Sequence, residues 1–259
     1  MKGGHLLAIE ELHVRFGGLI VLEGVSMEVG DGSFFGIIGP NGAGKTTLLN
    51  AISGLVPVQA GAIRFGNDEV DLTRRGPHVR ARLGISRTFQ HSSLFKGLTI
   101  LDQLLCGAYS AARYDPISSL GRLPHVLRRE GSLKRDALGL LADLGLRGAE
   151  NLTIDRLPGA HRRLVDLARS LMTRPRLLLL DEIAAGTSVE ERQTVIRLLR
   201  RRQADDGMSI VVIEHDLEFI RALATDLVVL AEGRVLSRGE PTEVLARPEV
   251  LHAYVGEER

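Results

Sequence analysis

Hydrophobic positions divide the chain into short apolar runs separated by amphipathic stretches. Residues 7–12 and 20–29 alternate between apolar and polar side chains, as half-buried strands do. FFGIIG, residues 34–39, is a short apolar run that ends at glycine, which predicts a buried strand. Further strands are predicted at 62–67, 85–90, 176–181, 208–215 and 226–239. The last of these is predicted as a hairpin with Glu232 and Gly233 at its turn.

Helical periodicity lies between and after these strands. Helices are predicted at 46–55, 190–204, 216–224 and 241–255. A longer helical region interrupts the alternation, with stretches at 99–112, 120–130, 132–146 and 161–172 and a break at Pro124. Strands that alternate with helices predict a largely parallel α/β sheet. We expect residues 1–259 to form one α/β domain that carries an inserted helical subdomain at 95–173.

Composition limits where the chain works and what it contacts. The 259 residues are 44% hydrophobic, enough for a substantial core, and their net charge of +1 without a basic tract argues against nucleic acid as a partner. Cys106 is the single cysteine, so no intrachain disulfide can form, which fits a reducing compartment. No apolar run approaches the ~18 residues that span a bilayer. We therefore expect a soluble, cytoplasmic chain, for which any membrane role must come through a partner.

A phosphate-binding loop is the most specific motif. The segment GPNGAGKTT fits the pattern G-x-x-x-x-G-K-[ST] between a predicted strand and a predicted helix. Its members are Gly39, Pro40, Asn41, Gly42, Ala43, Gly44, Lys45, Thr46 and Thr47. Glycines let backbone amides surround phosphate oxygens, Lys45 neutralises the β and γ phosphates, and Thr46 is expected to bind Mg²⁺. The alternative is a glycine turn before an ordinary helix.

Two carboxylates follow the most apolar strand. Four leucines at 177–180 precede Asp181 and Glu182, at the end of a strand where open α/β sheets bind ligands. We expect Asp181 to hold Mg²⁺ through a water molecule and Glu182 to orient the water that attacks the γ-phosphate. The alternative is a solvated strand end followed by a turn.

The order of these motifs resembles that of the ATP-binding-cassette (ABC) family over nearly the whole chain. The resemblance implies a P-loop ATPase core with an antiparallel β-subdomain and an α-helical subdomain, and ATP hydrolysis with Mg²⁺. It implies that Gln90 is the glutamine-loop residue near Mg²⁺ and that His215 senses the γ-phosphate. It also implies that Phe16 stacks on adenine. Each of these residues has an alternative interpretation. Under it, Gln90 is an ordinary polar residue leaving a strand, His215 caps the following helix, and Phe16 packs in the core.

Within the family, the chain resembles one of the paired ATPase subunits of branched-chain amino-acid importers. RTFQHSSLF, the helical segment near 110–135, EHDLEFI and RPEVLHAYVGEE carry this likeness. It implies a second ATPase subunit, integral membrane permease subunits, an indirect link to a solute-binding protein, and a peripheral position at the cytoplasmic face of the inner membrane. No residue of this chain is expected to contact the transported solute.

The chain departs from the family at its signature segment. The family pattern L-S-G-G-Q aligns with Leu157, Pro158, Gly159, Ala160 and His161, of which only Leu157 and Gly159 match. Pro158 offers neither a hydroxyl nor an N–H group to the ATP of the opposite subunit. Each charge-assisted hydrogen bond lost there costs about 1.5–3 kcal/mol.

The D-loop after the acidic pair departs as well. Ile183 replaces the usual proline, and Ala185, Gly186, Thr187 and Ser188 replace the usual pattern, which removes its carboxylate or amide.

These departures lead to a hypothesis of unequal subunits. The chain keeps its own phosphate loop but offers a weak signature, so a heterodimer with an intact cassette has one good composite site. Under the alternative, the substitutions are tolerated, because Gly159 and the helix dipole suffice to bind the ATP of the opposite subunit. A degenerate cassette that binds ATP as a regulatory or structural half is the competing function. A soluble cassette acting on DNA or ribosomes is the third, disfavoured by the near-neutral charge.

Overall fold

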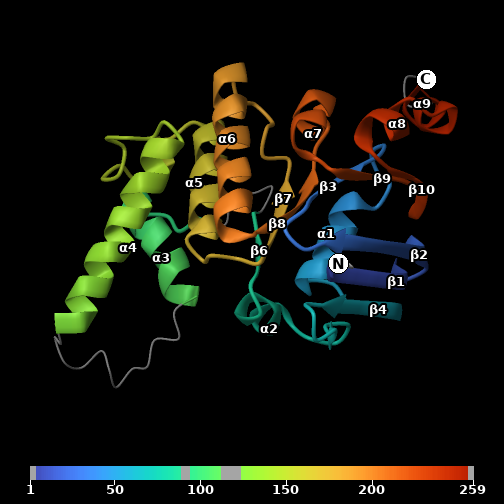
Figure 1. Cartoon of the computed structure of the whole chain (residues 1–259), viewed down its shortest axis with the longest axis horizontal. Coiled ribbons are helices and arrows are strands. Elements are labelled where there is room, and N and C mark those ends of the chain that lie inside the picture. Colours follow the sequence, from blue (N-terminus) through green and yellow to red (C-terminus); the bar gives the residue numbers. More distant parts are fainter. Residues whose placement is uncertain (1–3, 89–93, 112–123, 256–259) are drawn as a thin grey trace.

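The computed structural model describes residues 4–88, 94–111 and 124–255. Within this part of the chain, two sheets and the helices around them form the fold (Figure 1).

The central sheet is parallel except at one edge. Its strands, in the order β10-β9-β3-β8-β7-β6, are neighbours through parallel pairs, and only β10 runs antiparallel to β9. They are β3 (Phe34–Ile38), β6 (Ile85–Arg87), β7 (Leu177–Asp181), β8 (Ser209–Ile213), β9 (Asp226–Ala231) and β10 (Arg234–Gly239). The predicted hairpin is confirmed: Glu232 (φ 48°) and Gly233 (φ 75°) connect β9 to β10 with the two left-handed residues of a type I′ turn.

A second, antiparallel sheet comes mainly from the N-terminal strands, as expected. Its order is β2-β1-β4-β5. The strands are β1 (His5–Phe16), β2 (Leu19–Gly30), β4 (Ala60–Phe65) and β5 (Val70–Asp71). The mixed α/β fold class, with a separate antiparallel sheet, is therefore confirmed.

The helices are distributed along the whole described chain. They are α1 (Lys45–Ser53), α2 (Pro77–Arg82), α3 (Ile100–Ala111), α4 (Pro124–Asp143), the 3₁₀ turn η1 (Ile154–Arg156), α5 (Gly159–Leu171), α6 (Val189–Asp206), α7 (Leu217–Leu223), α8 (Pro241–Leu245) and α9 (Pro248–Val255). Among these described helices, none is long and apolar enough to cross a membrane.

Two helix predictions were wrong in their bounds. In the described part of the stretches 120–130 and 132–146, one continuous helix, α4 (Pro124–Asp143), runs through Gly131. Pro124 is the first described residue of this helix. The single helix predicted at 241–255 is two helices, because Pro248 cannot continue α8 and starts α9.

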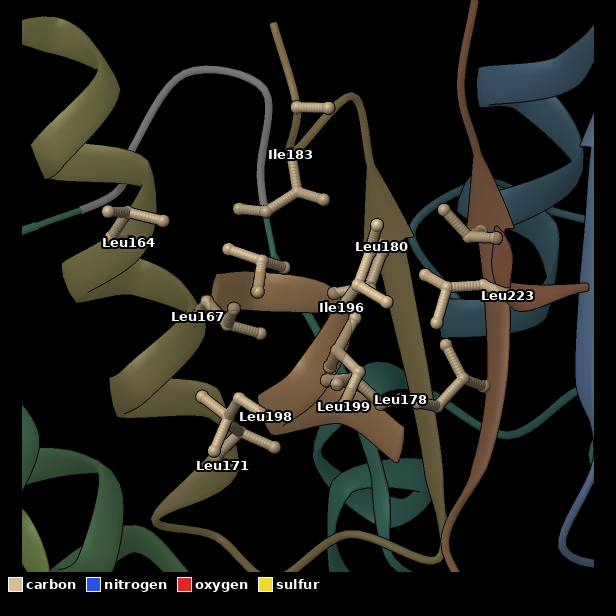
Figure 2. Packing of buried hydrophobic residues seen from close by; sticks show 14 of the residues in the cluster. Leu164, Leu167, Leu171, Leu178, Leu180, Ile183, Ile196, Leu198, Leu199 and Leu223 are labelled. Atoms are coloured by element: carbon tan, nitrogen blue, oxygen red, sulfur yellow. The ribbon is translucent and has the colours of Figure 1, made fainter. Parts of the chain in front are cut away.

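The central strands are buried on both faces, and each face belongs to a different core. Leu178 and Leu180 of β7 pack with helices α5, α6 and α7, which Figure 2 shows from close by. Leu177 and Leu179 point to the opposite face and pack with α1 and the antiparallel sheet. Successive strand side chains alternate between faces, so an unbroken leucine run fits a strand that lies between two cores.

Helices α3, α4 and α5 lie together at the end of the molecule away from the antiparallel sheet (Figure 1). Leu104 of α3, Leu141 of α4 and Leu164 of α5 belong to the core on the α5–α7 face of the central sheet. That residues 95–173 form a subdomain of their own stays a prediction.

Candidate active site

The loop after β3 has glycine where a side chain does not fit. Gly39 has φ 148° and Gly44 has φ 96°, both in the left-handed half of backbone space. A Cβ on Gly39 would overlap the carbonyl oxygen of Leu230, and a Cβ on Gly44 would lie 2.6 Å from Cδ2 of Leu22. The predicted glycines are therefore required by close packing against β9 and β2, which hold the loop in place.

Helix α1 begins directly after this loop. Its N-cap, Gly44, has no side chain to accept a hydrogen bond, and its first turn contains no acidic residue. The first N–H groups of a helix have no partner within the helix, and they carry the positive end of its dipole. Gly42 of the loop and Thr46 of α1 are exposed to solvent. Backbone donors and the Thr46 hydroxyl are thus available to an anionic ligand.

Lys45 places a positive charge inside the loop. Its side chain is buried, and Nζ donates hydrogen bonds to the carbonyl oxygens of Gly39 (2.6 Å) and Pro40 (2.8 Å). Together with the helix N-terminus, this ammonium gives the loop the electrostatic character of a phosphate-binding site.

The strand order brings the predicted side chains to one edge of the sheet. Strands β3, β8 and β7 are adjacent and parallel, so the loop that contains Lys45, the segment that contains His215 and the acidic pair all follow neighbouring strand ends. Ligands of open α/β sheets bind at these carboxyl ends. The sequence predicted the motifs, and the topology puts Lys45, Asp181, Glu182 and His215 on the same side.

Asp181 is the buried member of the acidic pair. It is 3% exposed, its Oδ2 accepts a hydrogen bond from Nη2 of Arg87 at 3.0 Å, and its N–H donates to Oγ1 of Thr88. Burial raises the pKa of its carboxyl group, and the charge of Arg87 opposes this. Within the described residues, no donor reaches Oδ1.

This unpartnered carboxylate oxygen fits a cation. Mg²⁺ in nucleotide sites is held by one or two carboxylates, while phosphates and water supply its other ligands. Asp181 and Thr46 offer oxygens of the kind that Mg²⁺ prefers. Gln90, the third predicted ligand, lies outside the described residues.

Glu182 and His215 contact each other. Oε1 of Glu182 lies 3.2 Å from Nε2 of His215. Glu182 has φ 52°, and its N–H donates to the carbonyl oxygen of Ile213 on the adjacent strand. This turn directs the glutamate off the end of β7, where it and the histidine are partly exposed to solvent. Such a pair can orient a water molecule and accept its proton.

Phe16 is 48% exposed at the end of β1. It is therefore not a core residue, and the predicted contact with adenine stays a prediction.

Sequence reasoning missed two buried charged residues beside the site. Glu214 is 3% exposed, and its Oε1 accepts a hydrogen bond from the N–H of Ala184 at 2.6 Å. Burial, together with the charge of Glu182, raises the pKa of Glu214 to about 7. Arg87 is the second, through its ion pair with Asp181. A charged residue directly after the buried strand SIVVI is the one signal that pointed to Glu214.

The divergent signature segment starts α5. Pro158 is the N-cap, and both Pro158 and Gly159 are exposed. His161 Nε2 lies 2.8 Å from Oε1 of Glu191, whose side chain also completes the capping box of α6 with Ser188. The first turns of α5 and α6 are thereby joined.

The residues after the acidic pair lie at this junction. Ile183 is buried, and the carbonyl oxygen of Ala185 accepts a hydrogen bond from Arg163 of α5. The sequence departures at the signature and the D-loop therefore lie next to each other.

Comparison with known proteins agrees with this architecture. The profile of the ABC transporter family matches residues 22–185. The chain is 32% identical to the high-affinity branched-chain amino acid transport ATP-binding protein BraF of Pseudomonas aeruginosa, over 97% of this chain and 98% of that protein. It is 31% identical to the probable branched-chain amino acid transport ATP-binding protein LivG of Methanocaldococcus jannaschii, over 97% and 98%.

Solved structures give the same result. A nucleotide-free ATP-binding cassette from an ABC transporter superposes with a TM-score of 0.81 at 29% identity, covering 97% of this chain and 99% of the other. An ATP-binding cassette in its ADP conformation gives a TM-score of 0.81 at 29% identity, covering 98% and 99%. The family match, the near-complete coverage and the fold all agree, and the chain belongs to the ABC transporter family as an ATP-hydrolysing subunit.

Proposed function

We propose that this chain is one of two ATPase subunits that power the import of branched-chain or similar hydrophobic amino acids. The observation that carries the proposal is the similarity, over 97% of the chain, to proteins named for branched-chain amino acid transport. The subunit acts from the cytoplasmic face of the membrane, bound to integral permease subunits, and a separate solute-binding protein delivers the amino acid to them.

The reaction is hydrolysis of ATP to ADP and phosphate. The triphosphate lies along residues 39–47, where backbone N–H groups and Lys45 balance the charge that develops on the transferred phosphoryl group. Thr46, Asp181 and Gln90 would hold Mg²⁺, which would neutralise charge on the phosphates. Glu182 orients the attacking water. His215, whose Nε2 lies 3.2 Å from Oε1 of Glu182, contacts the γ-phosphate and keeps the Glu182 carboxylate in place.

Two different cassettes close head to tail around the nucleotides. Pro158 is exposed at the start of α5, where the family presents a serine, and it has neither a hydroxyl nor an N–H group. A partner with an intact signature completes the site built on this chain's phosphate loop. Closure moves the permeases through the segment that contains Gln90.

Reconstitution tests the proposal. The chain, its partner cassette, the permeases and the binding protein, placed in vesicles, should take up labelled leucine, isoleucine or valine when ATP is supplied. Glu182→Gln should abolish uptake and trap ATP, whereas a regulatory half would leave the activity of the complex nearly unchanged. Uptake by the variant complex at the wild-type rate would reject the catalytic role.

The signature hypothesis has its own test in the isolated chain. The wild-type chain alone should hydrolyse ATP slowly, and the double substitution Pro158→Ser with Ala160→Gly should raise that rate. Turnover per subunit that is as high in the isolated wild-type chain as in the complex would contradict unequal subunits.

A further inference from the structure

Arg87 connects three elements around the site, namely β6, α1 and β7. It is the last residue of β6, its side chain is 5% exposed, and its Nη2 donates to Oδ2 of Asp181 at 3.0 Å. Its Nη1 donates to Oδ1 of Asn50 at 2.6 Å and to Oγ of Ser53 at 3.2 Å. Both of these acceptors are on α1, the helix that starts at the phosphate loop. The guanidinium therefore bridges the phosphate-loop helix and the strand that carries the acidic pair.

This bridge fixes the orientation of the Asp181 carboxylate. One oxygen, Oδ2, is held by Arg87, and the other, Oδ1, has no donor from the described part of the chain. The backbone is fixed too: the N–H of Asp181 donates to Oγ1 of Thr88, and the N–H of Thr88 donates to the carbonyl oxygen of Leu179. One oxygen of the carboxylate is thus held by Arg87, and the other, Oδ1, is buried without a hydrogen-bond donor from the described residues.

An arginine suits this task better than a lysine. The guanidinium is planar and presents its N–H groups in a rigid fork, so bonds to α1 on one side and to Asp181 on the other define its plane. A lysine ammonium carries the same charge on a single nitrogen. It cannot reproduce hydrogen bonds that now leave from two separate nitrogens toward two different elements.

We propose that Arg87 is a positioning residue, which holds Asp181 so that Oδ1 faces the magnesium ion of bound MgATP. The proposal rests on the proposed function, because it takes Asp181 as the carboxylate that serves the metal. Arg87 itself contacts neither the nucleotide nor the metal and acts through Asp181. Groups that orient a metal ligand in this way typically change metal affinity 10–100-fold when they are replaced.

The competing explanation is a purely structural ion pair. Removing either partner leaves a buried charge alone, so Arg87→Ala risks general destabilisation. Arg87→Lys keeps the charge and removes the fork, which makes it the informative variant. Arg80 supplies the matched control. It is also a buried arginine beside α1, 1% exposed, but its guanidinium donates hydrogen bonds to backbone carbonyl oxygens, among them those of Ala51 and Ile52.

The experiment measures ATP affinity by titration calorimetry, once with EDTA and once with saturating Mg²⁺. A magnesium titration then gives the Mg²⁺ concentration at which half of the increase in ATP affinity is reached. In the wild-type chain, magnesium should tighten ATP binding. Arg87→Lys should keep the EDTA affinity, since the phosphate loop is intact, but need at least about tenfold more magnesium. Arg80→Lys should lower the melting temperature and keep the wild-type magnesium dependence.

The outcomes separate the two proposals. If the wild-type chain binds ATP no tighter with magnesium, the proposed magnesium site fails, and the role of Arg87 fails with it. If the wild-type chain responds to magnesium and Arg87→Lys responds equally, only the positioning role is overturned. If Arg87→Lys and Arg80→Lys lose the magnesium response to the same extent, Arg87 is a structural residue and the inference is again rejected.

Discussion

Glu214 makes the stability of this protein depend on pH in a predictable direction. It is buried, and it accepts a hydrogen bond from the N–H of Ala184 at 2.6 Å. Burial raises its pKa from the ordinary value of 4.5 to about 7, although the N–H groups of Ala184 and His215 favour the charged form. We consider the substitution Glu214→Gln, which keeps the size of the side chain and removes the titration.

The magnitude follows from the two pKa values. The folded chain binds the Glu214 proton more tightly than the unfolded chain, so the stability from this proton is fully present below about pH 4.5 and lost as the pH rises through about 7. The difference between the unfolded-state pKa of 4.5 and the folded-state pKa of about 7 corresponds to about 3 kcal/mol of folding free energy, at ~1.4 kcal/mol per pKa unit. As the pH rises from about 4.5 to about 8, the free energy of unfolding of Glu214→Gln should therefore increase by about 3 kcal/mol relative to that of the wild-type chain.

Urea unfolding without nucleotide, measured across this pH range, checks the prediction. Val212→Ala is the matched control, because Val212 is buried in β8 near Glu214 and has no titratable group. It should lower the free energy of unfolding by the same amount at every pH. A difference between Glu214→Gln and wild type that stays constant with pH would refute the reasoning.

Three further substitutions test the loop, the core and the adenine contact. Gly39→Ala should abolish ATP binding in a titration, because its Cβ would overlap the carbonyl oxygen of Leu230; normal affinity would contradict the packing of the loop. Leu180→Ala should lower the free energy of urea unfolding by about 2–5 kcal/mol, since Leu180 is fully buried; a change below about 1 kcal/mol would argue against this core. Phe16→Ala should weaken ATP binding about tenfold without lowering the melting temperature, because Phe16 is 48% exposed; the opposite pattern would make it a packing residue.

Local patterns predicted the parts of the fold that local interactions decide. The leucine run at 177–180 became a central strand because both of its faces are buried. Glu232 and Gly233 became a hairpin turn because both adopt left-handed backbone angles. The place of the loop around Lys45, between a strand and a helix, was predicted because its glycines, lysine and following helix are contiguous in sequence, and its binding of phosphate stays a prediction.

The missed features depend on contacts between distant segments. Arg87 and Asp181 are separated by 94 positions, and only the pairing of β6 with β7 brings them together. The role of Glu214 likewise depends on Ala184, which follows the neighbouring strand. The predicted helix at 241–255 failed for a different reason, because Pro248 starts a second helix there.

Binding of ATP at the loop after β3 is the central claim, and Lys45 tests it most directly. Titration calorimetry with MgATP should show binding to the wild-type chain and, for Lys45→Ala, an affinity about a hundredfold lower, because charge-assisted contacts to the phosphates are lost. Lys134→Ala, which removes an exposed lysine on α4, should bind like the wild-type chain. Equal affinity of Lys45→Ala and wild type, or no binding by the wild-type chain, would contradict the account.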